Sequence, residues 1–154
     1  MTTPATIVYS ELSSHSYTSE DRIALTLTDA TTIPTNVFQN CQWLEAITLP
    51  ASLETIGYAA FSGCDNLISV TFERTTSPLT TGTSAFQNCT ALKTLQLPDG
   101  LTSIELNSFQ NCTALASVTF ESSTNPLTIG NFAFYGCTAL TALLFPEGLT
   151  SIGL

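Results

Sequence analysis

Residues 44–66 carry the stretch LEAITLPASLETIGYAAFSGCDN, and variants of this stretch fill most of the chain. Every copy ends near a cysteine, and the five cysteines lie in VFQNC, AFSGC, AFQNC, SFQNC and AFYGC. They follow one another at intervals of 23, 25, 23 and 25 residues, at Cys41, Cys64, Cys89, Cys112 and Cys137. Self-similarity at a period of about 20–50 residues is typical of proteins that stack one structural unit on the next. We therefore predict a repeat solenoid.

The units alternate between a short and a long form. After 44–66 come units at 67–91, 92–114 and 115–139, then a partial unit at 140–154. A degenerate first unit precedes them, from about Ile23 to Trp43. The two extra residues of the long form lie in ERTTSP and ESSTNP, which replace LPASL or LPDGL. This predicts a longer loop on every second coil.

Each unit opens with a β-strand pattern. In residues 46–49 apolar and polar side chains alternate, which predicts a strand. Stacked units bring these strands into parallel register about 4.8 Å apart. Pro50 ends the strand, because proline cannot continue ladder pairing. A short apolar pair, Leu53 with Ile56, follows, and we then expect one helical turn that carries Phe61.

The residue before each cysteine is either asparagine or glycine. Both tolerate the left-handed backbone conformation that ends a helix. We therefore expect a positive φ at these positions, with the following cysteine pointing inward. The positions are Asn40, Gly63, Asn88, Asn111 and Gly136.

The pattern LxxLxLPxxLxxIGxxAFxxC resembles the BspA-like leucine-rich repeat, and residues 44–64 fit it almost position for position. The resemblance covers roughly residues 23–154. It departs at Thr81, where an apolar residue is expected, at Glu105, where glycine is expected, and throughout 1–22. It implies a right-handed leucine-rich repeat solenoid with a parallel β-sheet face and short helical turns. The expected solenoid has about five and a half coils of alternating 23 and 25 residues, preceded by a capping or assembly segment at 1–22.

The resemblance also implies a location and a role. Proteins of this family are surface-exposed or secreted proteins of bacteria and protists, often adhesins that bind host or partner-cell proteins. An extracellular or cell-surface location is therefore expected. A secretory signal peptide is not expected in this chain, because no positive charge precedes Arg22. No apolar run approaches the roughly 18 residues that a membrane-spanning helix needs.

The charge balance restricts the partners. The chain contains twelve acidic residues and only three basic ones, Arg22, Arg74 and Lys93, so the formal net charge is −9. Nucleic acid requires a basic surface that displaces counterions, and anionic membrane surfaces also attract basic segments. The charge balance therefore argues against nucleic acid and against anionic membrane surfaces, and the lack of a long apolar run argues against membrane insertion.

The cysteine column admits three chemical roles: disulfides, metal ligation and nucleophilic catalysis. Their number is odd, no CxxC pair occurs, and the only histidine, His15, lies outside the repeats. Zinc requires about four converging nitrogen or sulfur ligands, and the pattern offers none. We interpret the cysteines as small buried hydrophobes in the reduced state, and we expect no metal and no cofactor.

Carboxylates also recur with the repeat. Glu73 and Glu121 occupy equivalent positions two coils apart, as do Asp99 and Glu147. This spacing follows from the repeat, so we interpret all four as solvated turn residues rather than as a catalytic pair. Without a glycine-rich phosphate loop or a GxSxG motif, the sequence predicts that the chain is not an enzyme.

Two tripeptides match the N-glycosylation pattern, Asn88-Cys89-Thr90 and Asn111-Cys112-Thr113. Both asparagines are already explained as turn residues. The adjacent buried cysteines argue against access by a glycosylating enzyme.

The outward positions of the strands form two columns of small, mostly hydroxylated side chains. Threonine suits any exposed β surface, and the same face is where solenoids commonly bind a partner. A face for ice is a remote third possibility, because Gln96 and Leu144 interrupt the threonines. The candidate binding residues for a protein or glycan are Ala46, Thr48, Ser69, Thr71, Thr94, Gln96, Ser117, Thr119, Ala142 and Leu144, and the columns begin at Ala24 and Thr26.

The last unit holds a strand and the second apolar pair but not the AFxxC turn. Residues 8–12, VYSEL, loosely resemble that turn. One hypothesis is that residues 6–12 of one molecule complete the last coil of its neighbour, which would stack copies end to end into a fibre. The alternatives are a truncated chain, or an N-terminal segment that caps its own first coil. The candidate assembly residues are Val8, Tyr9, Leu12, Leu149, Ile152 and Leu154.

Overall fold

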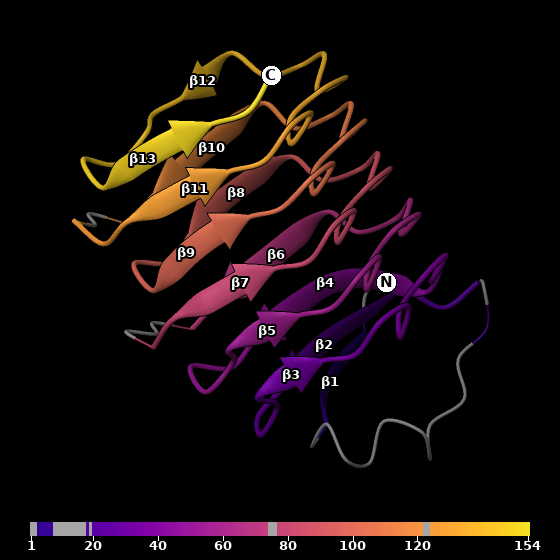
Figure 1. Ribbon diagram of the computed structural model, residues 1–154. Coiled ribbons are helices and arrows are strands. Elements are labelled where there is room, and N and C mark those ends of the chain that lie inside the picture. The colour runs from indigo at the N-terminus through magenta and orange to yellow at the C-terminus, as the bar shows by residue number, and fades with distance from the viewer. Residues whose placement is uncertain (1–2, 8–17, 19, 74–76, 122–123) are drawn as a thin grey trace.

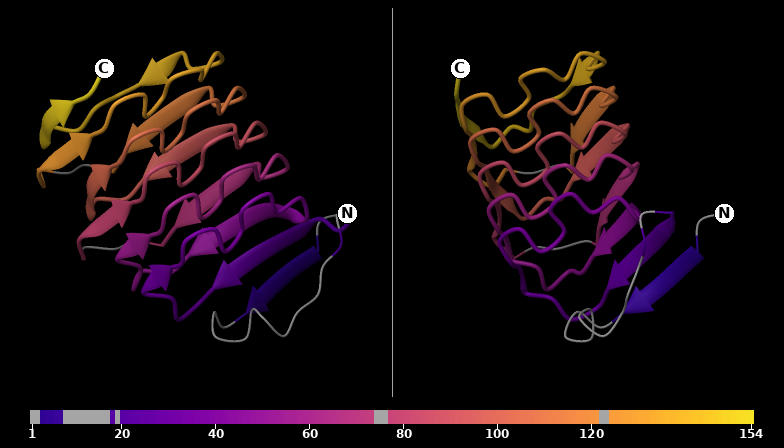
Figure 2. Two further views of the ribbon diagram at one scale, coloured as in Figure 1. Left: turned by 45° about the vertical axis from the view of Figure 1, so that its right-hand side comes forward. Right: turned by 90° about the vertical axis from the view of Figure 1, so that its right-hand side faces the viewer.

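The protein is a parallel β-solenoid in the computed structural model, which describes residues 3–7, 18, 20–73, 77–121 and 124–154 (Figure 1). Each complete coil contains a longer strand, a shorter strand and a turn that returns the chain to the start of the next coil. Figure 2 shows the coils stacked along one axis, with equivalent strands side by side. The structure thus confirms the expected repeat solenoid.

The first strands of the coils form a seven-stranded parallel sheet, here called sheet A. Neighbouring strands come from successive coils. In spatial order they are β1 (Thr3–Ile7), β2 (Ile23–Leu27), β4 (Leu44–Leu49), β6 (Ser69–Phe72), β8 (Thr94–Leu97), β10 (Ser117–Phe120) and β12 (Ala142–Leu143).

The second strands form a six-stranded parallel sheet, sheet B. The repeat pattern predicts a single sheet face and no strand at the second apolar pair of each unit, and this expectation is incomplete. The pair could not be distinguished from loop because it spans only two to four residues. The strands are β3 (Thr32–Ile33), β5 (Thr55–Ile56), β7 (Leu79–Thr81), β9 (Leu101–Ile104), β11 (Leu127–Ile129) and β13 (Leu149–Ile152).

The core lies inside the coils, and a column of phenylalanine rings runs through it. Phe61, Phe86 and Phe109 are fully buried. Each ring stacks nearly parallel on its neighbours, with centroids 4.9 Å apart between Phe61 and Phe86 and 5.2 Å apart between Phe86 and Phe109. Phe38 and Phe134 extend the column at its two ends. The spacing matches the separation of parallel strands, because each coil contributes one ring per level.

The expected helical turn is absent from the described residues, and the segment that carries each phenylalanine consists of consecutive turns. The reason is where the backbone hydrogen bonds go. Phe61 N–H donates to the carbonyl of Ala85 in the next coil at 2.7 Å, and Gly63 N–H to that of Gln87 at 2.8 Å. These N–H groups are therefore not available to a helix, and the turns themselves pair from coil to coil.

A left-handed backbone interrupts each turn twice. The expected positive φ before every cysteine is confirmed, with values from 57° at Asn40 to 76° at Gly136. A second column of positive φ lies four residues earlier and was not predicted. Its members include Ala59 and Phe132, residue types that rarely adopt this conformation. The second column is Asn36, Ala59, Ser84, Asn107 and Phe132.

The N-terminal strand β1 belongs to the same sheet as the repeats. It pairs in parallel with β2, from Thr3 opposite Ile23 to Ile7 opposite Leu27. Sheet A thus extends across the expected boundary at residue 22, and the division into 1–22 and 23–154 stays a prediction. Val8, Tyr9 and Leu12 lie outside the described residues, as do 74–76 and 122–123 in the two longer loops, whose expected conformation therefore also stays a prediction.

Candidate binding face

The outer face of sheet A carries the first of the two predicted columns in unbroken register. Strand pairing places each member directly opposite the next, from β2 to β12. All six side chains are small, and Thr94 and Ala142 are exposed. The column is Ala24, Ala46, Ser69, Thr94, Ser117 and Ala142.

The second column is less regular. Thr26, Thr48 and Thr71 are in register, and Gln96 lies opposite Thr119. Leu144 lies beyond the end of β12 and is 70% exposed, so it continues the column in sequence but not as part of the sheet. Together the two columns give a surface of serine and threonine hydroxyl groups with one amide, three alanines and Leu144, and this surface is the candidate binding face.

Two grooves border this face near the carboxyl ends of the strands. The first has a volume of about 250 Å³ and the second of about 290 Å³. Phe72 lines the first groove and Phe120 the second, 48 residues further along the chain, while Glu121 lines both. The first also contains Ser69, Val70, Thr71, Thr94, Gln96 and Pro98, and the second Thr124, Leu144, Phe145, Pro146 and Glu147.

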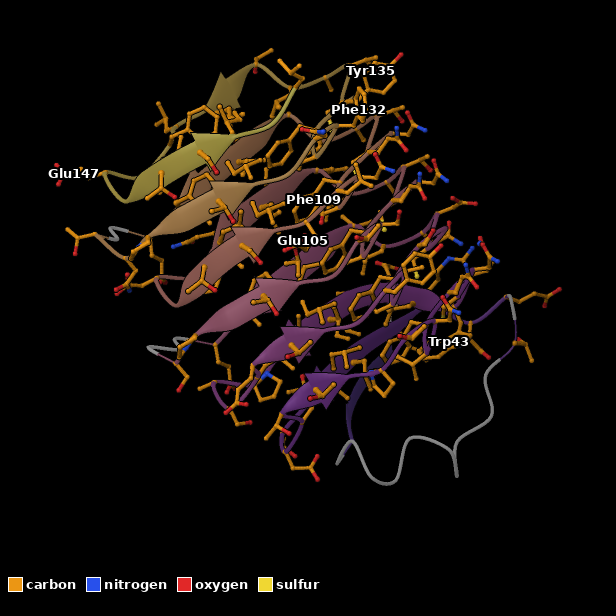
Figure 3. All side chains as sticks on the ribbon, in the orientation of Figure 1. Trp43, Glu105, Phe109, Phe132, Tyr135 and Glu147 are labelled. Atoms are coloured by element: carbon orange, nitrogen blue, oxygen red, sulfur yellow. The ribbon has the colours of Figure 1, made fainter. Side chains whose placement is uncertain are left out.

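Two of the four recurring carboxylates bind backbone rather than only solvent. Glu73 Oε2 accepts a hydrogen bond from Ala51 N–H at 3.2 Å, and Glu121 Oε2 accepts one from Asp99 N–H at 3.3 Å. Each glutamate of a long coil thus holds the turn of the preceding short coil. The prediction of simple solvated turns was too coarse for these two residues. Glu147 is exposed and extends from the turn before β13 (Figure 3).

The cysteines form a buried ladder, and all five are free thiols. From the second coil on, each Sγ donates to the phenylalanine carbonyl of the preceding coil. Cys64 reaches Phe38 O at 2.9 Å, and Cys89 reaches Phe61 O at 3.2 Å. Cys112 and Cys137 make the equivalent contacts at 3.2 and 3.1 Å. The thiol therefore satisfies a carbonyl in the turn, a role that the sequence interpretation of a plain hydrophobe missed.

Burial also suppresses thiol chemistry. Desolvation raises the pKa of Cys41 to about 11 and the pKa of Cys64 to about 12, and it raises the pKa of Cys89 well above its usual value. At neutral pH these thiols are protonated and are poor nucleophiles and poor metal ligands. Within the described residues no group of three or more metal-ligating side chains converges. His15 lies outside the described residues.

The asparagines of the two glycosylation tripeptides interact with each other. Asn111 Nδ2 donates to Asn88 Oδ1 at 3.0 Å. Where the next residue in this column is glycine, the asparagine side chain instead occupies the space of the missing Cβ. A Cβ on Gly63 would lie 2.2 Å from Asn40 Oδ1. An asparagine in this column is thus followed either by a glycine that leaves space for its side chain, as at Asn40, or by an asparagine that donates to it, as at Asn88.

One buried polar cluster was not predicted, although two of its members break the repeat pattern. Thr81 and Ser108 are fully buried, with their hydroxyl oxygens 3.2 Å apart. Glu105 N–H donates to Thr81 Oγ1 at 3.4 Å, whereas the glycines at the equivalent position donate to a main-chain oxygen of the preceding coil at 2.7 Å. Thr81 therefore supplies an acceptor that Glu105 needs. The sequence does contain a signal for this cluster, because Thr81 and Glu105, the two residues that depart from the repeat pattern, lie in adjacent coils. Glu105 is labelled in Figure 3.

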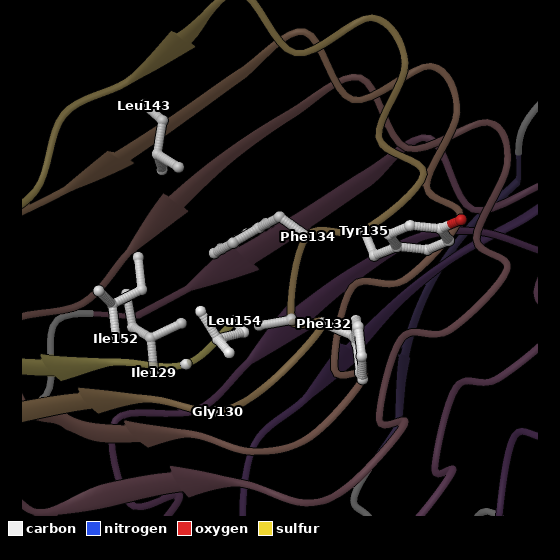
Figure 4. Close-up of a pocket in the computed structure, with 10 residues that line it drawn as sticks. Ile129, Gly130, Phe132, Phe134, Tyr135, Leu143, Ile152 and Leu154 are labelled. Carbon is white, nitrogen blue, oxygen red and sulfur yellow. The ribbon is translucent and has the colours of Figure 1, made fainter.

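The C-terminal end of the solenoid carries an apolar pocket of about 290 Å³ (Figure 4). Phe134, Leu143 and Ile152 line it, together with Phe132 and Tyr135, whose rings meet edge to face. Ile152 is 56% exposed and Leu154 97% exposed. Of the predicted assembly residues, Ile152 and Leu154 thus contribute to one surface, while Leu149 packs against the core.

The comparisons identify the repeat. A family model described as the BspA type leucine-rich repeat region matches residues 31–154 in six copies. A search of curated proteins finds no match. In the described part of the chain no helix is long and apolar enough to cross a membrane.

Solved structures of bacterial leucine-rich repeat proteins are also similar. A protein from Bacteroides capillosus ATCC 29799 is 26% identical with a TM-score of 0.48, over 60% of this chain and 64% of its own. A leucine-rich repeat protein of T. pallidum is 18% identical with a TM-score of 0.41, and the match covers 76% of this chain and 78% of that protein. A leucine-rich cell surface protein from Faecalibacterium prausnitzii A2-165 is 21% identical with a TM-score of 0.45, and the match covers 83% of this chain and 48% of that protein. This chain thus spans less than two thirds of the first protein and about half of the third.

Proposed function

This chain belongs to the BspA-type leucine-rich repeat family, and on that premise we propose that it is a non-enzymatic binding module that recognises a protein or a glycan through the outer face of sheet A. The supporting observation is the column of small side chains that stays in register from Ala24 to Ala142. The proposal includes an extracellular or cell-surface location, as is usual in the family.

The face suits binding because it is formed before any ligand arrives. Parallel strands hold the hydroxyl groups of Thr48, Thr71 and Thr119 on a fixed backbone, so a ligand loses little free energy to ordering the protein. Hydroxyls both donate and accept hydrogen bonds, and the Gln96 amide does the same with a longer reach. Such a surface offers polar contacts to a peptide or a sugar without a deep cavity.

A pair of matched variants tests which face binds. Thr71 lies exposed in β6 of sheet A, and Thr128 lies exposed in β11 of sheet B. The probes are collagen, fibronectin, mucin and a set of β-linked oligosaccharides, each immobilised for surface plasmon resonance. We expect Thr71→Arg to weaken binding at least tenfold and Thr128→Arg to leave it unchanged. Equal binding by both variants would contradict the proposal.

A second role is end-to-end stacking of copies through the apolar pocket that Phe132, Phe134 and Ile152 line. In this role the C-terminal pocket would receive a coil of a second copy. Sedimentation velocity at increasing concentration, with electron microscopy of the same sample, measures this association. We expect Ile152→Glu to abolish it while the fold, measured by circular dichroism, is retained. A monomer at every concentration would exclude the stacking role.

A further inference from the structure

The two grooves beside sheet A are built from equivalent positions two coils apart. Each contains a phenylalanine from the end of a sheet A strand and a proline from the following coil. The pairs are Phe72 with Pro98 in the first groove and Phe120 with Pro146 in the second. Gln96 and Leu144 occupy a third equivalent position, one in each groove. The surface therefore presents a phenylalanine with a proline twice along the solenoid axis, in grooves that polar side chains also line.

The spacing between the grooves follows from the stacking. Neighbouring parallel strands lie about 4.7–4.9 Å apart, so equivalent points two coils apart are separated by roughly 9.4–9.8 Å. A polyproline-II helix rises about 3.1 Å per residue with three residues per turn, which gives about 9.3 Å per turn. An extended β-strand repeats about every 6.6–6.8 Å and an α-helix about every 5.4 Å, and neither matches two coils.

The side chains of the grooves suit the same occupant. Proline-rich segments dock on surfaces lined by aromatic rings, and the phenylalanines provide such rings. Glu121 lines both grooves and Glu147 lines the second. Glu121 uses Oε2 for the hydrogen bond with Asp99 N–H, which leaves Oε1 to face a ligand. With a net charge of −9, the chain attracts a positively charged partner.

We propose that the two grooves bind a proline-rich segment of another protein in the polyproline-II conformation that also carries positively charged residues. One turn of the ligand lies against each groove. Its prolines contact Phe72 and Phe120, and its positive side chains approach Glu121 and Glu147. This inference rests on the proposed binding role of sheet A and specifies the ligand class for that face.

Synthetic peptides test the ligand class directly. The probe is a peptide of four Pro-Pro-Arg triplets, labelled for fluorescence anisotropy, and unlabelled peptides compete with it. A peptide of four Gly-Gly-Arg triplets keeps the charge and its spacing but has neither the proline rings nor the extended polyproline-II conformation. We expect the Pro-Pro-Arg peptide to bind, the Gly-Gly-Arg peptide to bind at least tenfold more weakly, and Pro-Pro-Glu triplets not to bind. Equal binding of the two arginine peptides would mean attraction by charge alone and would overturn the polyproline-II assignment.

Two variants locate the binding. Glu121→Gln removes one charge from the grooves and keeps an oxygen for Asp99 N–H, while Glu54→Gln removes one exposed charge before β5 in sheet B. The loss of a single partly exposed ion pair should weaken the binding of the Pro-Pro-Arg peptide to Glu121→Gln by about threefold to fivefold. Binding to Glu54→Gln should be unchanged. Equal effects from the two variants would mean attraction by net charge alone, which contradicts the assigned site.

Failure of this inference can be distinguished from failure of the proposed function. If the Pro-Pro-Arg peptide does not bind, the polyproline-II ligand is wrong. The binding role of sheet A is then still judged by the comparison of Thr71→Arg with Thr128→Arg on matrix proteins, mucin and oligosaccharides. If an oligosaccharide binds and loses affinity in Glu121→Gln, the grooves are a glycan site, and the peptide assignment is overturned while the face is retained.

Discussion

The hydrogen bond between Glu105 and Thr81 predicts that the effect of Thr81→Val depends on residue 105. In the wild-type chain the substitution removes Oγ1, the acceptor of Glu105 N–H. In the Glu105→Gly variant the same N–H can approach the carbonyl of residue 81, as Gly57, Gly82 and Gly130 approach the preceding coil at 2.7 Å. Valine is then acceptable, because it is the type of residue that the repeat pattern expects there.

The magnitude follows from the cost of an unpaired donor. The hydrogen bond of Glu105 N–H is partly buried, so its loss lies at the lower end of the range of about 1–3 kcal/mol that a buried unpaired donor costs. Thr81→Val should therefore lower the free energy of unfolding by about 1 kcal/mol in the wild-type chain. Ser108 keeps its acceptors, since its Oγ also donates to Glu105 O at 2.8 Å and to Gly82 O at 3.1 Å. In the Glu105→Gly background the substitution should be nearly neutral or stabilising.

The assay is a double-mutant cycle by urea denaturation, which compares wild type, the two single variants and the double variant. We expect a coupling free energy of about 1 kcal/mol, within the range found for residues in contact. Thr128→Val with Glu105→Gly is the control pair, because Thr128 is exposed and Glu105 N–H donates to Thr81 rather than to Thr128. The effects of this pair should add. Additive effects of Thr81→Val and Glu105→Gly would refute the compensation.

Three further predictions follow from the core and the turns. Phe86→Ala should lower the free energy of unfolding by about 3–5 kcal/mol and the half-buried Phe134→Ala by clearly less, as measured in urea, since Phe86 has rings on both sides. Equal losses would contradict the stacked core. Gly63→Val should destabilise clearly and Gly63→Asn only mildly, because Asn111 above Asn88 shows that two asparagines can follow each other in this column. Equal melting temperatures of the Gly63→Val and Gly63→Asn variants would contradict the role of the positive φ at this position. Stability should fall as the pH rises from about 9 toward 12, because thiols ionise in the unfolded chain while Cys64 stays protonated in the fold. Cys64→Ala should reduce that slope, and alkylation of the denatured, unreduced protein should modify five thiols.

Much of the fold could be predicted because stacking repeats each local constraint in every coil. The strands of sheet A, the buried phenylalanines and the positive φ before each cysteine all follow from periodic residue types. The helical turn could not be excluded from the sequence. Segments such as Ala59 to Gly63 contain residues compatible with a helix. Two features prevent one, namely the pairing of Phe61 and Gly63 N–H with the next coil and the positive φ of Ala59 and Gly63.

The candidate site was predicted less completely, for a physical reason. The columns of sheet A follow from alternation within a strand, and their register follows from the repeat. The grooves depend on how far Phe72 and Phe120 are covered by the next coil, which residue type does not reveal. The compensation of Glu105 by Thr81 depends on a hydrogen bond between side chain and main chain, and in the sequence it appears only as two separate departures from the pattern.

The period of two coils also indicates where function lies. Stacking alone requires a period of one coil, because each coil contacts only its neighbours. Yet Leu49, Phe72, Leu97 and Phe120 alternate at equivalent positions, and only the two phenylalanines remain partly exposed. Phe145 departs from the alternation in the last coil. Phe72 and Phe120 pack partly against the core, while leucine at this position is fully buried, so burial alone does not require the larger ring. The larger ring forms one wall of each groove, and a surface role for the two-coil period accounts for it.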